Sequence, residues 1–238
     1  MTQPSFVAEY ETVWDSTTSP KTVMNAVAIT AGDVLVACIM AEGNDGLGAS
    51  LGITENGSSS WVEKQRIAVN AYCELVIYTY TAVSNENLTV TITCSSGIVA
   101  FGCNILHFNA SGGVGTGSNK ENGTDGGAGT EPSLSITTEA ADSAVVIACG
   151  DWTADDGGDR AWRNNVGSAV VEKTFAFVDT RYTAYAGYHA TCGAANTYAV
   201  GLSAPVSMKY SIAAVEVKGI ASVPIPVFQA SYRRRRIS

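Results

Sequence analysis

Apolar and polar residues alternate with a period of two along most of the chain. The clearest run is residues 88–94, where apolar side chains alternate with three threonines in the sequence LTVTITC. Because successive side chains of a β-strand point to opposite faces, this alternation predicts a strand with one buried face. No stretch of about 11 residues keeps the apolar spacing of a surface helix, so we expect little or no helix.

Other strand-like runs are apolar at both sets of alternate positions. Residues 34–40, with the sequence VLVACIM, are the best example. A strand of this kind is covered on both faces in a folded protein. With further runs near the N-terminus, at residues 6–14 and 21–29, the pattern indicates about 11 or 12 strands. We therefore expect an all-β protein.

The two halves of the chain have the same order of segments. VEK at residues 62–64 returns at residues 171–173, and the run around Cys38 resembles the run around Cys149. We expect quasi-repeats over about residues 20–110 and 131–219, joined by a Gly-rich loop at residues 111–130. That loop is either a linker between two domains or an excursion within one. Because each half has only five clear strands, some of them apolar on both faces, we favour one antiparallel β-sandwich over residues 1–219.

Composition and charge narrow the range of functions. Apolar residues make up 46% of the chain and charged residues 15%, which fits a folded β body rather than a disordered chain. The formal charge is −8, and it is −12 when the four arginines near the C-terminus are set aside. An acidic body repels phosphate, so we expect no nucleic-acid binding by it. No apolar run reaches the length of a membrane span, and the first residues lack a secretion signal, so we expect no membrane partner.

The C-terminus differs from the rest of the chain. Residues 220–238 are predicted to form an extended arm, because Pro224 and Pro226 lack the N–H donors of an interior strand. The arm carries apolar side chains and then four cations, and it either lies across its own body, docks on a neighbouring subunit or remains a solvated tail. Its candidate partner-binding residues are Ile225, Val227, Phe228, Tyr232, Arg233, Arg234, Arg235 and Arg236. The arginines are suited to pair with carboxylates of acidic bodies, while binding of packaged nucleic acid is a weaker alternative.

No residue pattern marks a catalytic or metal site. The cysteines form no CxxC pair, and His107 and His189 are the only histidines, so we expect neither zinc nor a cofactor. The cysteines are expected to be reduced core residues, with one or two disulfides as the alternative. The Gly-rich loop lacks the GK[ST] sequence of a phosphate-binding loop, and there is no GxSxG nucleophile motif. We therefore expect no enzymatic activity.

Residues 151–159 and the aromatic residues beside them are the best candidates for a ligand site. Four aspartates in this segment suggest either a solvated acidic loop or a calcium site whose spacing differs from an EF-hand. Trp152 and Trp162 flank it, and aromatic rings beside carboxylates suit stacking on sugars. The alternative is that both tryptophans cap the ends of the core.

The order of strands and turns resembles jelly-roll domains in virion proteins of tailed bacteriophages, such as minor tail proteins and head-decorating proteins. The matching residues are 32–37, Trp61, 78–82, 88–92 and 98–108, and the resemblance covers about residues 20–219. It implies a jelly-roll sandwich built into a particle and carries no site residues.

The sequence thus predicts a structural virion protein, head-decorating or tail-associated, that acts by binding other virion subunits. We expect a homo-oligomer, located in the virion and assembled in the host cytoplasm. The alternative is a carbohydrate-binding β-sandwich module of an adhesion apparatus.

Overall fold

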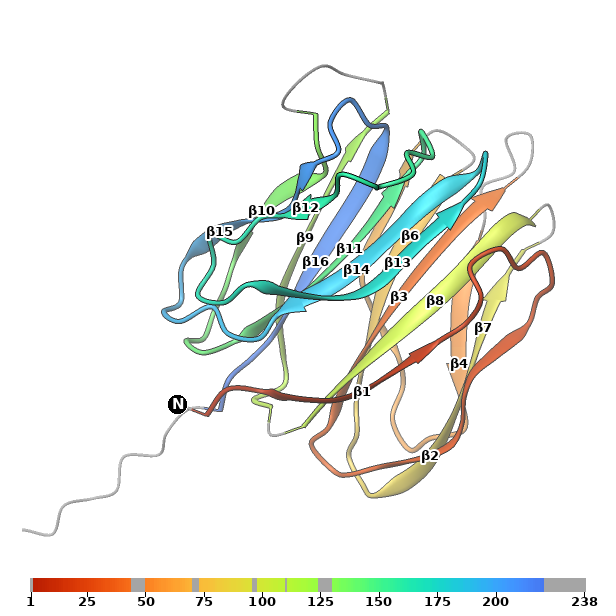
Figure 1. The fold of residues 1–238 in the computed structure, drawn as a ribbon. Coiled ribbons are helices and arrows are strands. Elements are labelled where there is room, and N and C mark those ends of the chain that lie inside the picture. Colours follow the sequence, from red (N-terminus) through yellow and green to blue (C-terminus); the bar gives the residue numbers. More distant parts are fainter. Residues whose placement is uncertain are drawn as a thin grey trace, which may run out of the picture.

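The structure is a computed structural model that describes residues 2–43, 50–69, 73–95, 98–109, 111–123 and 130–220. These residues form sixteen β-strands and no helix (Figure 1). In chain order the strands are β1 (Ser5–Glu11), β2 (Lys21–Ile29), β3 (Val34–Gly43), β4 (Leu51–Glu55), β5 (Val62–Val69), β6 (Cys73–Thr81), β7 (Glu86–Cys94), β8 (Ile98–Asn109), β9 (Val114–Asn122), β10 (Ser133–Thr137), β11 (Ala144–Asp151), β12 (Ala161–Trp162), β13 (Val170–Val178), β14 (Tyr182–His189), β15 (Thr197–Ala204) and β16 (Tyr210–Val217). Every pair of neighbouring strands is antiparallel. The prediction of an all-β, antiparallel protein is confirmed.

The strands form two five-stranded and two three-stranded sheets. The first five-stranded sheet has the order β1-β8-β3-β6-β5, and the second has the order β13-β14-β11-β16-β9. The three-stranded sheets have the orders β2-β7-β4 and β10-β15-β12. Strands β1–β8 thus build one large and one small sheet, and β9–β16 build the other two. The second set repeats the pairing of the first: each strand of β1–β8 has the same neighbours, by position in its set, as the strand eight numbers later in β9–β16.

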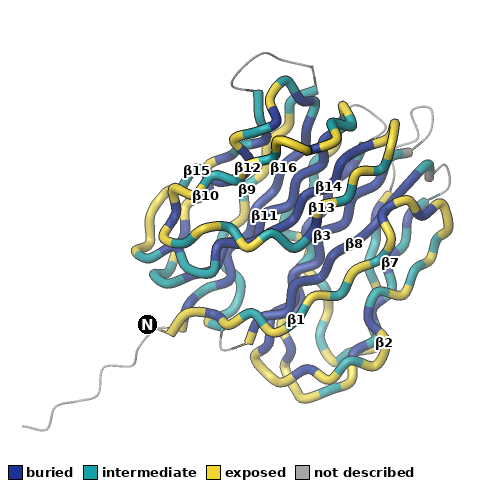
Figure 2. Tube along the Cα trace, viewed as in Figure 1, coloured by how far each residue is buried: buried dark blue, intermediate teal, exposed yellow. Residues whose placement is uncertain are grey.

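The sheets stack in four layers with three apolar interiors between them. Leu35 and Ile39 of β3 face the small sheet β2-β7-β4, whereas Val34 and Val36 face the other way, toward the second five-stranded sheet. The second five-stranded sheet is covered in the same manner. The central strands of both large sheets are mostly buried, whereas the edge strands β1, β5, β9 and β13 are partly exposed (Figure 2). A single sandwich has two layers and one interior. The body has more because the central strands are apolar at both sets of alternate positions.

The central interior joins the two sets of strands by side chains of complementary size. The second large sheet contributes mainly small residues, including Ala148 and Ala184, and the first contributes larger ones such as Met40 and Phe108. Hydrogen bonds also cross this interface. The Asn104 amide donates to Thr174 Oγ1 at 2.7 Å, and Thr174 Oγ1 donates to a Glu11 carboxylate oxygen at 2.8 Å.

The Gly-rich segment is not the plain loop that its sequence predicts. Residues 114–122 form β9, an edge strand that pairs with β16. Glycine, serine and asparagine are poor strand formers, so local propensity gave no signal here. Glycine permits a close approach: a Cβ at Gly115 would meet the buried, hydrogen-bonded Glu216 carboxylate, whereas one at Gly117 would require only the Gln65 side chain to move.

The two ends of the described chain lie side by side. Thr2 N donates to Ile220 O at 3.1 Å, and Ile220 N donates to Thr2 O at 2.8 Å, which makes an antiparallel bridge. The same proximity is visible where the end of β16 approaches the N-terminus (Figure 1). Ile220, the last described residue, is therefore fixed at one corner of the body.

Candidate functional site

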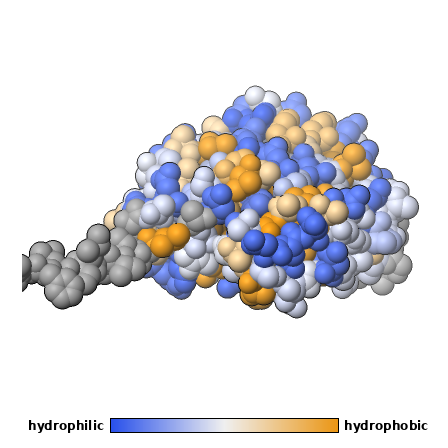
Figure 3. Space-filling model, turned by 90° about the horizontal axis from the view of Figure 1, so that it is seen from below, coloured by the Kyte–Doolittle hydropathy of each residue, from blue (hydrophilic) through white to orange (hydrophobic). Residues whose placement is uncertain are grey.

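The predicted partner-binding residues of the arm lie outside the described residues. They are Ile225, Val227, Phe228, Tyr232, Arg233, Arg234, Arg235 and Arg236. The structure gives the point from which the arm starts, at Ile220 beside Thr2. Seen from below, the body around this end has a mostly polar surface with separate apolar patches (Figure 3).

Trp152 and Trp162 are both half-buried, and they pack on different interiors. The Trp152 indole N–H donates to Ser211 Oγ at 3.1 Å, and its ring lies against the central interior with Tyr182 at 5.4 Å. The Trp162 N–H donates to Glu172 Oε2 at 2.8 Å, and its ring packs on the interior of the second small sheet. The two rings therefore form no common stacking platform. A glycan-binding role for either residue stays a prediction.

The carboxylates of the 151–159 segment bond mainly to the backbone of their own loop. Asp151 is fully buried and accepts hydrogen bonds from Thr153 N and Asp155 N, each at 2.8 Å. Burial raises the pKa of Asp151 to about 6 in spite of these bonds. Asp155 and Asp156 each accept one further backbone N–H, from glycines two residues ahead. Among the described residues, no group of three or more carboxylates, histidines or cysteines is placed to hold a metal ion.

Arg160 does not neutralise the aspartates beside it. Its guanidinium instead forms a two-pronged ion pair with Glu172, at 2.9–3.2 Å, and lies 3.7 Å from the centre of the Phe175 ring. Burial would raise the pKa of Glu172, but the hydrogen bonds from Arg160 and Trp162 hold it below its ordinary value. This cluster fixes the loop to the outer face of β13.

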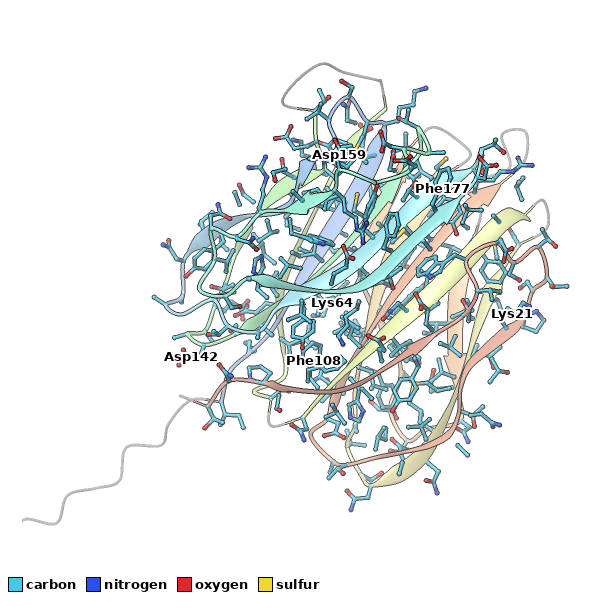
Figure 4. All side chains as sticks on the ribbon, viewed as in Figure 1. Lys21, Lys64, Phe108, Asp142, Asp159 and Phe177 are labelled. Atoms are coloured by element: carbon cyan, nitrogen blue, oxygen red, sulfur yellow. The ribbon has the colours of Figure 1, made fainter. Side chains whose placement is uncertain are left out.

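A groove of about 540 Å³ opens between the two large sheets at the end of the body where β13 turns into β14. Residues 13–15, 99–100 and 176–179, together with Arg181, line it. Two of its apolar side chains are unusually open to solvent, with exposures of 63% for Val13 and 41% for Phe177. Phe177 is labelled near this end, and Asp142 near the opposite end, where residue 220 lies (Figure 4).

A hydrogen bond anchors one side of the groove, and the rim is charged. Tyr182 Oη, at the start of β14, donates to the carbonyl of the lining residue Trp14 at 2.6 Å. Asp15, Asp179 and Arg181 are exposed at the rim, and no ion pair joins any of them to another described residue. The groove can therefore accept an apolar segment that is followed by cationic side chains.

Sequence reasoning missed this groove. Val13 and Phe177 are far apart in the sequence, and no local pattern shows that they meet. The sequence did contain one signal, two phenylalanines at alternate positions of β13. Both Phe175 and Phe177 are exposed on this edge strand, and exposed apolar side chains at a sheet edge are typical of a binding surface.

A second cavity, of about 480 Å³, lies beside a buried His–Asp pair. His107 Nε2 is 2.8 Å from Asp33 Oδ2, and Thr30 N donates to the same oxygen at 2.8 Å. His189 lies elsewhere, with Nδ1 2.7 Å from the Ser168 carbonyl, and burial lowers its pKa. The two histidines thus belong to separate places and form no common site.

Comparison of the chain with protein-family models, curated proteins and solved structures finds no match in any of the three. In the described part of the chain, no helix is both long and apolar enough to span a bilayer.

Proposed function

We propose that the protein is a non-enzymatic structural component of a tailed-phage virion, either head-decorating or tail-associated, that acts by binding other virion subunits. We further propose that β1–β8 and β9–β16 are two quasi-repeated jelly rolls. The strand order supports this, because the first and last strands of each set pair in the large sheet and the second and seventh pair in the small sheet. Eight strands in two packed sheets are the architecture of jelly rolls, which are common in capsid proteins.

The observation that carries the proposal is the bridge between Thr2 and Ile220. It fixes Ile220, the residue from which the arm follows in the sequence, at one corner of a four-layer body. In sequence, the residues of the arm offer an apolar run and then four arginines, on a chain whose formal charge is otherwise −12. Arginine–carboxylate pairs between copies are the interaction that this separation of charge favours.

Association between copies is therefore the mechanism, and we expect a homo-oligomer that also contacts other virion subunits. Buried area at an arm contact comes from the apolar residues, and the arginines supply long-range attraction and orientation. No cofactor is needed for such a role, and assembly takes place in the host cytoplasm.

Sedimentation of the full-length chain tests this mechanism. We expect concentration-dependent association that weakens by about tenfold or more between 50 mM and 500 mM salt, since exposed charges are screened. Replacing Arg233, Arg234, Arg235 and Arg236 by serine should weaken association and remove most of its salt dependence. Lys21→Ser with Lys64→Ser, which changes two cations of the body, is the control and should leave association unchanged. A wild-type chain that stays monomeric would contradict the proposal.

The location in a particle has a separate test. Mass spectrometry of purified particles from the host that carries this gene should find the chain at a fixed ratio to the major capsid or tail subunit. Finding it only in the soluble fraction would overturn the virion role.

A further inference from the structure

We propose that the groove beside Val13 and Phe177 is the acceptor for the apolar arm, residues 223–228, of a second copy of this chain. The inference rests on the proposed function, because it assumes that the arm associates with another subunit. It goes further by naming the surface that receives the arm and the geometry that results.

The shape and chemistry of the groove suit such a segment. Its volume, about 540 Å³, is within the range of pockets that enclose a ligand of several side chains. Val13, Phe177 and Val178 give it apolar walls. Val13 is 63% exposed and Phe177 is 41% exposed in the isolated chain, so a docked partner would remove apolar surface from water.

The sequence of the arm complements these walls. Val223, Ile225 and Val227 are separated by Pro224 and Pro226, which restrict the backbone to extended conformations. A segment restricted in this way loses little conformational entropy when it binds. The prolines also lack N–H donors, so the arm is poorly suited to pair as a complete strand along the free edge of β13.

The positive charge of the arm is complementary to the net negative charge at the rim of the groove. The exposed carboxylates of Asp15 and Asp179 stand at the rim, against the single guanidinium of Arg181. Arg233 lies five residues beyond Phe228, and five residues of extended chain span about 17 Å. The arginines can therefore reach the carboxylates around the groove while the apolar run occupies it.

An arm that fills the groove with the whole of residues 223–228 must come from another copy, because the start of this run cannot reach the groove of its own copy. The groove lies at the end of the second large sheet where β14 begins, because its lining residue Val178 pairs with Tyr182. The first residue of β16, Tyr210, lies at this same end of the sheet, since it pairs with Asp151 at the end of β11. The chain then runs the whole of β16, eight residues, before it reaches Ile220. At about 3.3 Å per residue this separation is about 25 Å.

The start of the arm cannot cover that distance. Val223 lies three residues beyond Ile220 and reaches at most about 10 Å, and Ile225 reaches about 17 Å. A second copy has no such restriction. Since the arm leaves one end of the body and the groove lies at the other, the contact is head-to-tail, and it generates a ring if the rotation closes or an open chain if it does not.

The test uses full-length variants that break one side of the contact. Val13→Lys places a cation in the groove, where it repels the arginines of the arm and would have to lose its hydration for the apolar residues to pack against it. Val83→Lys is the matched control, because Val83 is 66% exposed and does not line the groove. Ile225→Asp with Phe228→Asp breaks the arm. Unchanged thermal melting of each variant shows that the fold is kept.

We expect Val13→Lys and the arm variant each to weaken association by about tenfold or more, as loss of an interface hot spot does, and Val83→Lys to leave it unchanged. Mixing the groove variant, which has an intact arm, with the arm variant, which has an intact groove, should give a 1:1 complex and nothing larger. Weakening by the arm variant with no effect of Val13→Lys would overturn the inference and leave the proposed function in place. No effect of the arm variant would overturn the proposed function itself.

Discussion

The His107 imidazole and the Asp33 carboxylate form a buried hydrogen bond, with Nε2 and Oδ2 2.8 Å apart. The corresponding positions in β9–β16 hold a different pair: Glu216 pairs with Val145 as His107 pairs with Leu35, and Ser143 precedes β11 as Asp33 precedes β3. Ser143 Oγ donates to Glu216 Oε1 at 2.6 Å. In each set of strands, the residue before the third strand thus makes a buried polar contact with the last strand. The contact is between Asp33 and His107 in the first set and between Ser143 and Glu216 in the second.

Removal of Asp33 should destabilise the protein strongly. In Asp33→Ala, the His107 ring loses its partner while it remains buried, and an unpaired buried polar group of this kind costs about 2–4 kcal/mol. Urea unfolding measures the free energy of unfolding. Asp15→Ala, at an exposed carboxylate, is the control and should change it by less than about 0.5 kcal/mol. Equal losses in the two variants would show that the buried pair is not stabilising.

Glu216 offers a second test at the matching corner. Its carboxylate is fully buried and accepts hydrogen bonds from Glu139 N, Ala140 N and Ser143 Oγ. Glu216→Gln replaces one acceptor oxygen by a donor that faces these donors, so we expect a loss of about 2–4 kcal/mol in unfolding free energy. Glu139→Gln makes the same chemical change on an exposed side chain and should cost less than about 0.5 kcal/mol. A small effect of both changes would contradict the role given to Glu216.

Asp151 should make the stability of the protein depend on pH. Burial raises its pKa from 3.8 to about 6 in the folded state, so the folded protein binds this proton more tightly than the unfolded chain. The protonated Asp151 therefore contributes fully to the free energy of unfolding below pH 3.8, and this contribution is lost as pH rises through about 6. For a shift of this size the loss is about 3 kcal/mol. The difference in unfolding free energy between pH 4 and pH 7.5 should therefore be smaller by about 2–2.5 kcal/mol in Asp151→Asn. An identical pH profile in the variant would contradict the assignment.

The cysteines should be unreactive in the folded protein. All six are free thiols, and five of them are buried. Burial raises the pKa of Cys38, and of the less buried Cys73, to about 12, so almost no thiolate exists near neutral pH. Ellman's reagent at pH 8 should label none of them within minutes under native conditions and all six after unfolding in guanidinium. Rapid labelling of one thiol in the native protein would show that its part of the core opens to solvent.

Strands with a strong local pattern could be predicted from the sequence. The alternation in residues 88–94 matches β7, and the doubly apolar run from Val34 indicated that β3 needs cover on both faces. That pattern shows that cover is required, but it does not say which sheet provides it, so four layers could not be told from two. β4 is short and contains a glycine, and β9 is rich in glycine and asparagine, so neither has a local signal.

The candidate site was harder to predict than the strands. Trp152 and Trp162 were recognised by residue type, but their indole N–H groups bond to Ser211 and Glu172, partners that no local pattern reveals. The groove is lined by Val13, which follows β1, and by Phe177 of β13, and these residues come together only because the two large sheets face each other. Contacts of this kind arise from tertiary packing.

The strand pairing also determines when the chain can fold during synthesis. The first large sheet is complete once β8 has been made, at Asn109, but the face it turns toward the second large sheet stays open until β16 ends at Val217. At about 5–20 residues per second, the ribosome needs roughly 5–20 s to make that remainder. During this interval the nascent chain displays a broad apolar sheet to solvent, which makes it a natural client for chaperones at that stage.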